Sequence, residues 1–95
     1  MEIVQKAMAG TLESSDIIVV IDKGEKGIEV ELKSTVEKQF GSQIRKVIVE
    51  TLKSIGIENA KVMANDRGAL DCTIKARTLA AYYRATKSMD NKWGE

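Results

Sequence analysis

The stretch STVEKQFGSQIRKVIVETLKSIG, residues 34–56, decides the fold because it carries one continuous apolar stripe at helical spacing. The apolar residues of the stripe are Val36, Phe40, Ile44, Val47, Ile48, Leu52 and Ile55. Ser34 and Glu37 have the spacing of a capping box, and Gly56 stands where a left-handed C-cap belongs. We therefore predict a long amphipathic helix whose stripe, including Phe40, lies in the core.

On the N-terminal side of this helix the pattern predicts two strands. Residues 17–21 form a β-branched run that ends at a cluster of turn formers and charges, residues 22–27. Ile28, Val30 and Leu32 then alternate with charged residues, which is typical of a strand with one exposed face. We predict that the two runs pair as a hairpin.

On the C-terminal side the pattern repeats in outline. Residues 60–64 and 70–74 alternate between apolar and polar around the turn formers of residues 65–68, which predicts a second hairpin with Cys72 as a small buried side chain. Residues 76–87 have helix-forming composition.

The predicted fold class is therefore α+β, with the order β-β-α-β-β-α. We expect a two-layer sandwich in which an antiparallel sheet of two hairpins carries both helices on one face. The length of 95 residues fits one domain, 1–95, and we expect about residues 1–13 and 88–95 to be flexible.

Composition excludes several classes of function. Fifteen basic and fourteen acidic residues give a net charge of +1, so no strong field attracts nucleic acid or anionic lipid. The sequence has no histidine, which excludes a Ser/His or Cys/His nucleophile pair and leaves no zinc-ligand set, so we expect no bound metal. The single Cys72 and the absence of a long apolar run predict a soluble, cytoplasmic protein.

Two alternatives rest on local patterns. A basic segment with interleaved aromatic residues could contact nucleic acid, although such a segment is more often the solvated face of a terminal helix. It comprises Lys75, Arg77, Tyr82, Tyr83, Arg84, Lys87, Lys92 and Trp93. Asp66 and Asp71 flank a turn and could act as an acid/base pair in a small enzyme, but capping of the turn is the commoner role.

Three motifs in order carry a resemblance to a known family. They are AGTLESSD at residues 9–16, VEKQFG at residues 36–41 and DRGALDC at residues 66–72. Together, at these separations, they resemble the acyl carrier protein, or gamma subunit, of citrate lyase, and the match spans nearly the whole chain. The carrier subunit of malonate decarboxylase is a related alternative.

The resemblance implies a non-catalytic carrier. In that family a serine of the GTLES motif, which matches Ser14 here, bears a phosphoribosyl dephospho-coenzyme A arm through a phosphodiester. The thiol of the arm holds the acetyl or citryl thioester while citrate is cleaved to oxaloacetate and acetate. The implied partners are the alpha subunit (acyl transferase), the beta subunit (citryl lyase), the prosthetic-group transferase and an acetylating ligase, with no nucleic acid and no membrane.

The two neighbouring serines raise a question of register. In an extended segment Ser14 would share a side with Leu12, which argues against its exposure, whereas a turn over residues 13–16 would remove that objection. Glu13 and Asp16 bracket the serines, and we expect them to serve recognition by the transferase or to hold its metal ion.

Overall fold

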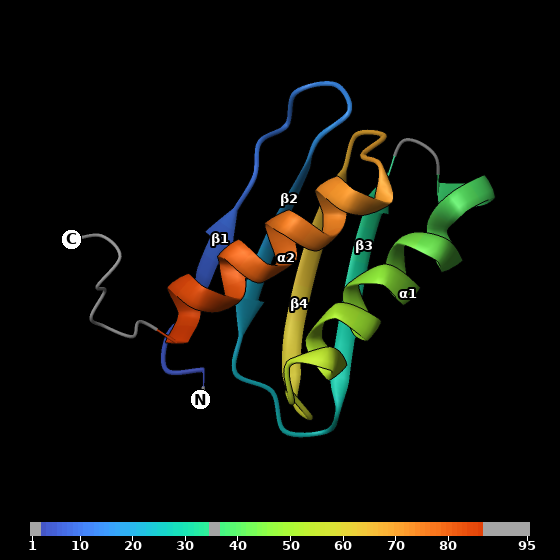
Figure 1. Cartoon of the computed structure of the whole chain (residues 1–95). Helices are drawn as coiled ribbons and strands as arrows, with labels where there is room; N and C mark the ends of the chain where they lie inside the picture. The colour runs from blue at the N-terminus through green and yellow to red at the C-terminus, as the bar shows by residue number, and fades with distance from the viewer. Residues whose placement is uncertain (1–2, 35–36, 87–95) are drawn as a thin grey trace.

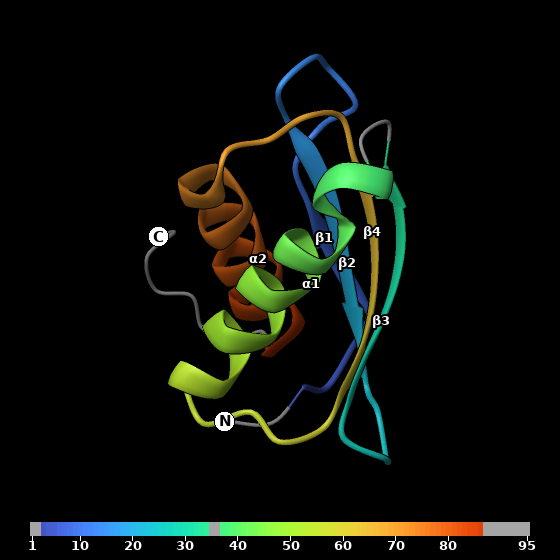
Figure 2. The same ribbon diagram turned by 90° about the vertical axis from the view of Figure 1, so that its right-hand side faces the viewer.

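The computed structural model describes residues 3–34 and 37–86. The elements are β1 (Ala7–Ala9), β2 (Ile17–Asp22), β3 (Ile28–Ser34), α1 (Glu37–Ser54), β4 (Ala60–Asp66) and α2 (Asp71–Thr86). Figures 1 and 2 show a single sheet with both helices on one face. The predicted α+β class and the two-layer arrangement are therefore confirmed.

The pairing within the sheet differs from the prediction. The strand order is β1-β2-β4-β3; β4 pairs antiparallel with β2 and parallel with β3. β2 and β3 are therefore not hairpin partners, because β4 lies between them. The chain leaves β3, crosses the sheet as α1 and returns as β4, and such a helical crossover is the connection that a parallel pair requires. The predicted antiparallel sheet of two hairpins is wrong, and the sheet is mixed.

The predicted second hairpin is also wrong, because residues 71–74 begin α2. Ile74 is buried and Cys72 is exposed, so Cys72 is not the buried side chain that alternation suggested. Ile74, Thr78, Ala81 and Ala85 are buried at helical steps of three and four residues. Alternation over so short a segment did not distinguish a strand from the first turn of a helix.

The N-terminal part of the chain contains a strand, β1, that the sequence pattern did not predict. β1 pairs antiparallel with β2, and the backbone amides of Val4 and Gln5 both donate to the carbonyl of Ala85 near the end of α2. Ile3 is buried in the core. Residues 88–95, the other segment expected to be flexible, lie outside the described residues.

The core lies between the sheet and the two helices. Its fully buried apolar side chains include Ile17, Val19, Ile21, Val62, Ile48, Leu52 and Ile74.

Phe40, predicted to be in the core, is 50% exposed. Figure 1 shows the first turns of α1 extending past the β3 edge, and the described part of the stripe is buried at Ile44, Ile48 and Leu52. The predicted capping box pairs Ser34, which ends β3, with Glu37, whose side chain lies outside the described part of the structure, so it stays a prediction. Among the helices of the described residues, none has the length and apolar character needed to cross a membrane.

Candidate functional site

The AGTLESSD motif forms the loop between β1 and β2. Figures 1 and 2 show this loop beside the connection from β4 to α2, at one end of the sheet. Ser14 and Ser15 are both exposed, whereas Asp16 is buried. The two serines therefore present their hydroxyl groups to solvent, whereas the Asp16 carboxylate faces the interior.

A tight turn places the two serines. The backbone amide of Asp16 donates to the carbonyl of Glu13 at 3.1 Å, which puts Ser14 and Ser15 at the two central positions. Ser15 has a φ of 66°, and it is the only non-glycine residue with positive φ in the described chain. A positive φ at the second central position alone is the pattern of a type II turn. This is the turn over residues 13–16 that would free Ser14 from the side of Leu12.

A β-bulge fixes the turn to the end of β4. The amide of Ser15 donates to the carbonyl of Arg67 at 2.7 Å, and the amide of Arg67 donates to the carbonyl of Asp16 at 2.9 Å. Two residues of one strand thus oppose one residue of the other, with Ser15 in the left-handed position that glycine usually takes. The bulge extends the β2–β4 ladder by one step beyond the pair of Ile17 and Asp66. Ser15 is anchored through its backbone, and Ser14 stands at the projecting corner.

The carboxylate of Asp16 holds the base of the loop together. Arg77 of α2 donates to it through Nε and Nη2, each at 2.9 Å, in a two-pronged ion pair. The hydroxyl of Thr11 and the amide of Ile17 donate to the same carboxylate at 2.6 and 2.8 Å. The Arg77 guanidinium foremost, then Thr11 and Ile17, hold the pKa of Asp16 well below its usual range.

This network changes the interpretation of the acids that bracket the serines. We expected Asp16 to face the transferase or its metal ion, but its carboxylate is used within the domain. Glu13 is exposed and remains available to a partner. The contribution of Arg77 comes from a residue 61 positions away, so nothing local in the motif signals it.

Asp66 and Asp71 have structural partners of their own. Asp66 is fully buried, and its carboxylate accepts hydrogen bonds from the amides of Gly68 and Ala69 and from the hydroxyl of Ser34. Asp71 accepts from the side-chain amide of Gln43 at 2.9 Å. Asp66 thus closes the turn between β4 and α2, and Asp71 links the two helices. These contacts favour the capping interpretation over an acid/base pair.

The basic and aromatic segment is largely used inside the domain. Arg77 pairs with Asp16, Arg84 donates to the carbonyl of Met8 at 2.8 Å, and Tyr82 is buried. Residues 87, 92 and 93 lie outside the described residues. In the described part of the chain, this segment does not form a free basic face with stacking aromatic rings, which nucleic-acid binding of this kind needs.

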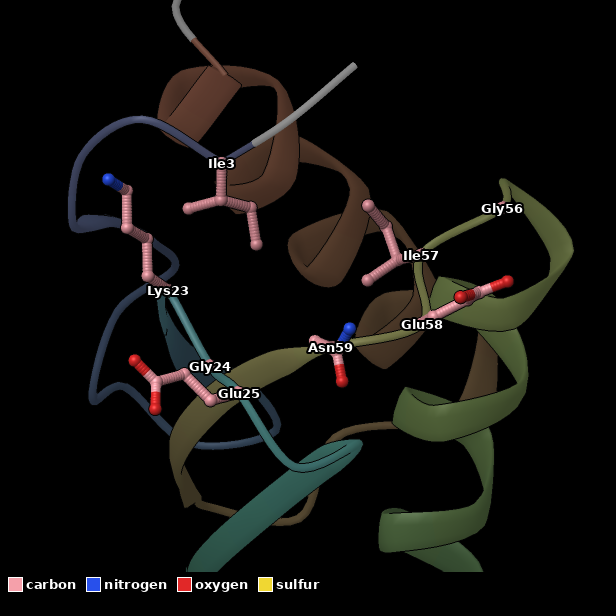
Figure 3. Close-up of a pocket in the computed structure, with 8 residues that line it drawn as sticks. All are labelled: Ile3, Lys23, Gly24, Glu25, Gly56, Ile57, Glu58 and Asn59. Carbon is pink, nitrogen blue, oxygen red and sulfur yellow. The ribbon is translucent and has the colours of Figure 1, made fainter.

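A hollow of about 560 Å³ lies at the end of the sheet opposite Ser14, between the β2–β3 connection and the segment that follows α1 (Figure 3). Gly24 approaches the backbone of Ala60 so closely here that a Cβ would lie 2.6 Å from a backbone carbon. The side-chain oxygen of Asn59 accepts from the amide of Gly27 at 2.7 Å. Close packing of two connections explains these features. Within the described residues, no group of three or more potential metal ligands gathers anywhere.

The ion pair of Asp16 leads to a prediction about acid stability. Because folding lowers the pKa of this carboxyl, its stabilisation is fully present above the usual aspartate range, about pH 4, and is lost as the pH falls below it. Asp16→Asn should therefore lower the urea midpoint at pH 7. The difference in urea midpoint between this variant and the wild type should become smaller between pH 4 and pH 2.5. Glu25→Gln, at an exposed site, is the control and should show no such gap. A gap that stays constant with pH would contradict the assignment.

Comparison with known proteins gives consistent matches over most of the chain. The family model described as the malonate decarboxylase delta subunit matches residues 4–85. The citrate lyase acyl carrier protein of Lactobacillus helveticus is 63% identical over 95% of this chain and 93% of that protein. Those of Lacticaseibacillus casei and Streptococcus mutans are 58% and 57% identical, each over 100% of this chain and 94% of the relative.

A solved structure shares the fold. A chain in the crystal structure of a Pseudomonas malonate decarboxylase hetero-tetramer in complex with malonate superposes with a TM-score of 0.71, covering 90% of this chain and 92% of that one. The sequence identity is 16%, so this likeness concerns the fold alone.

Proposed function

The chain belongs to the family of citrate lyase acyl carrier proteins, and from this premise we propose that it is the acyl carrier subunit of a citrate lyase complex. The observation that carries the proposal is the exposed hydroxyl of Ser14 at the corner of a turn that the bulge and the Asp16–Arg77 pair hold in place. The domain presents this serine and catalyses no step itself.

An acyl carrier of this family implies a covalently attached prosthetic group. We assign its attachment to Ser14 and its identity to phosphoribosyl dephospho-coenzyme A, joined through a phosphodiester. The residues present fit such a group, because the Ser14 side chain is exposed and forms no hydrogen bond with the described residues. The chain has no histidine to activate the hydroxyl, so the base that removes its proton belongs to the modifying transferase. When bound, the arm supplies a terminal thiol that carries the acyl group as a thioester.

In this proposal the domain provides a fixed attachment point for the arm. A tethered acyl group meets each active site as an intramolecular partner, at an effective concentration set by the length of the tether. The turn and the bulge fix the start of this tether, so the arm rather than the protein backbone spans the distance between partners. The partners in this proposal are the alpha and beta subunits of the lyase, the prosthetic-group transferase and an acetylating ligase, all in the cytoplasm.

A malonate decarboxylase carrier is the second candidate, because the matching family model and the solved structure both concern that enzyme. The citrate lyase assignment is favoured by the much higher identity of the relatives that bear that name. The two candidates share the fold and the carrier role, and they differ in the subunits with which the chain assembles.

Reconstitution distinguishes these candidates. The purified chain, modified by the transferase and acetylated, should support formation of oxaloacetate from citrate only after the alpha and beta subunits are added. The same preparation should not support decarboxylation of malonate by the catalytic subunits of malonate decarboxylase. Activity with the malonate enzyme alone would select the second candidate, and citrate cleavage by the isolated chain would contradict the carrier role.

A further inference from the structure

The backbone around Ser14 offers little to bind a phosphate group. The amide of Glu13 donates to the hydroxyl of Thr11, and that of Ser15 to Arg67. The amides of the next two residues donate to the carbonyl of Glu13 and to the carboxylate of Asp16. Phosphate sites in proteins often use free backbone amides of this kind. These four amides are occupied, and the amide of Ser14 is the one left without a hydrogen bond to the described residues, so a side-chain cation would supply most of the binding of a phosphate on Ser14.

Two arginines lie beside the loop, and only one has a free guanidinium. Arg77 is held by Asp16 through two hydrogen bonds. Arg67 stands opposite the bulge, joined to it by backbone hydrogen bonds of 2.7 and 2.9 Å, and its side chain is exposed. The Arg67 guanidinium forms no hydrogen bond or ion pair with any residue that the structure describes.

We propose that Arg67 is the phosphate-binding residue of the domain and that its guanidinium pairs with the phosphodiester at Ser14. This inference rests on the proposed function, since it takes the arm to be attached at Ser14 through a phosphodiester. The residue stands out because of its position in the bulge, where it directly opposes the residues that follow Ser14.

The reach and the charge both fit this role. Arg67 opposes Ser15 and Asp16, and Cα atoms of a hydrogen-bonded cross-strand pair lie about 5.5 Å apart. Ser14 is one residue further along the turn, and its phosphodiester would project from the side chain, so an extended arginine side chain can meet it. A guanidinium can bind two phosphate oxygens at once, which fixes direction as well as charge. Glu13 is exposed next to Ser14 and repels an added phosphate, so Arg67 would offset that repulsion and direct the first bonds of the arm.

The first test uses the wild-type protein and compares it before and after modification by the transferase. Arginine side-chain Nε–H signals are recorded by ¹⁵N NMR, with Arg77 as the internal reference because Asp16 holds it in both forms. The Arg67 signal should shift and exchange more slowly with water after modification, while the Arg77 signal stays in place. Modification on Ser14 with an unchanged Arg67 signal would overturn the inference and leave the proposed function intact. Failure of the wild type to gain the arm would overturn both.

The second test follows the phosphorus atom. In modified Arg67→Gln, the ³¹P signal of the serine-linked phosphodiester should move to the position found in a modified unfolded peptide of residues 9–16. Arg67→Lys should restore only part of the wild-type shift, because an ammonium lacks the forked geometry. Lys53→Gln removes one positive charge at the far end of α1 and should leave the signal unchanged. Equal signals in the wild type and Arg67→Gln would overturn the proposal.

Discussion

Ser14→Ala is expected to abolish the gain in mass that the transferase produces, and with it all carrier function, while the domain stays folded. The change removes the exposed hydroxyl at the corner of the turn and no hydrogen bond to the described residues. Alanine is also compatible with the first central position of the turn, where φ is negative. Intact-mass spectrometry after incubation with the transferase measures the loss, and circular dichroism with urea unfolding checks the fold.

The matched control for this experiment is the neighbouring serine. Ser15 takes the bulge position that glycine usually occupies, so Ser15→Gly should preserve the loop and remain a full substrate. Ser15→Ala should also be modified, since only the backbone of Ser15 anchors the bulge. Fragmentation mass spectrometry of the modified wild type locates the arm directly. An arm found on Ser15 would move the attachment site without changing the family.

Much of the fold could be predicted from local pattern. The stripe that ends at Ile55 predicts α1, and the run at residues 17–21 predicts β2, because burial on one face leaves a period in the sequence. The order of strands in the sheet leaves no such period. β4 has the same alternation whether it pairs with β2, with β3 or with both, and the parallel pair with β3 becomes evident only in three dimensions.

The two errors of burial have different origins. Phe40 continues the stripe of α1, yet the helix extends past the edge of the sheet and leaves the ring half exposed. Cys72 fits an alternating strand, but the segment is the first turn of α2, and Cys72 lies on its exposed side. Periodicity shows which face of an element is apolar, and the length of the neighbouring elements decides how much of that face is covered.

The motif of the attachment loop contains the serine that we assign as the attachment site, but it does not contain all the residues that hold the loop in place. The resemblance singled out Ser14 from its neighbours, but the reason for a rigid loop lies elsewhere in the chain. Arg77 and Arg67 come from the C-terminal third of the sequence, and each meets the loop only after the sheet has formed. Asp16 therefore looked like a surface acid for a partner, although it is the anchor of the loop.

Gly10, which opens the loop, should be the least tolerant position of the motif for folding. It has a φ of +104°, and a Cβ placed there would lie 1.8 Å from the carbonyl oxygen of Ile17. That oxygen belongs to Ile17, a buried residue that opens β2 and pairs with Asp66 of β4, so Gly10→Ala must either separate β1 from β2 or distort the loop. We expect a loss of about 3 kcal/mol or more in the free energy of unfolding, measured with urea. Modification of Ser14 should also slow in the fraction that remains folded, because the turn then loses its fixed base.

Gly68 is the control that separates the steric clash of a Cβ at Gly10 from the free-energy cost of a positive φ. It also has a positive φ, +89°, but a Cβ there would meet no atom within 4 Å. Gly68→Ala should therefore lose only about 1–2 kcal/mol, the cost of the left-handed conformation for a residue with a side chain. If both variants lose the same free energy, the approach of Gly10 to Ile17 is not the constraint that shapes the loop. A larger loss for Gly10→Ala together with slower modification would tie the geometry of the β1–β2 junction to the presentation of Ser14.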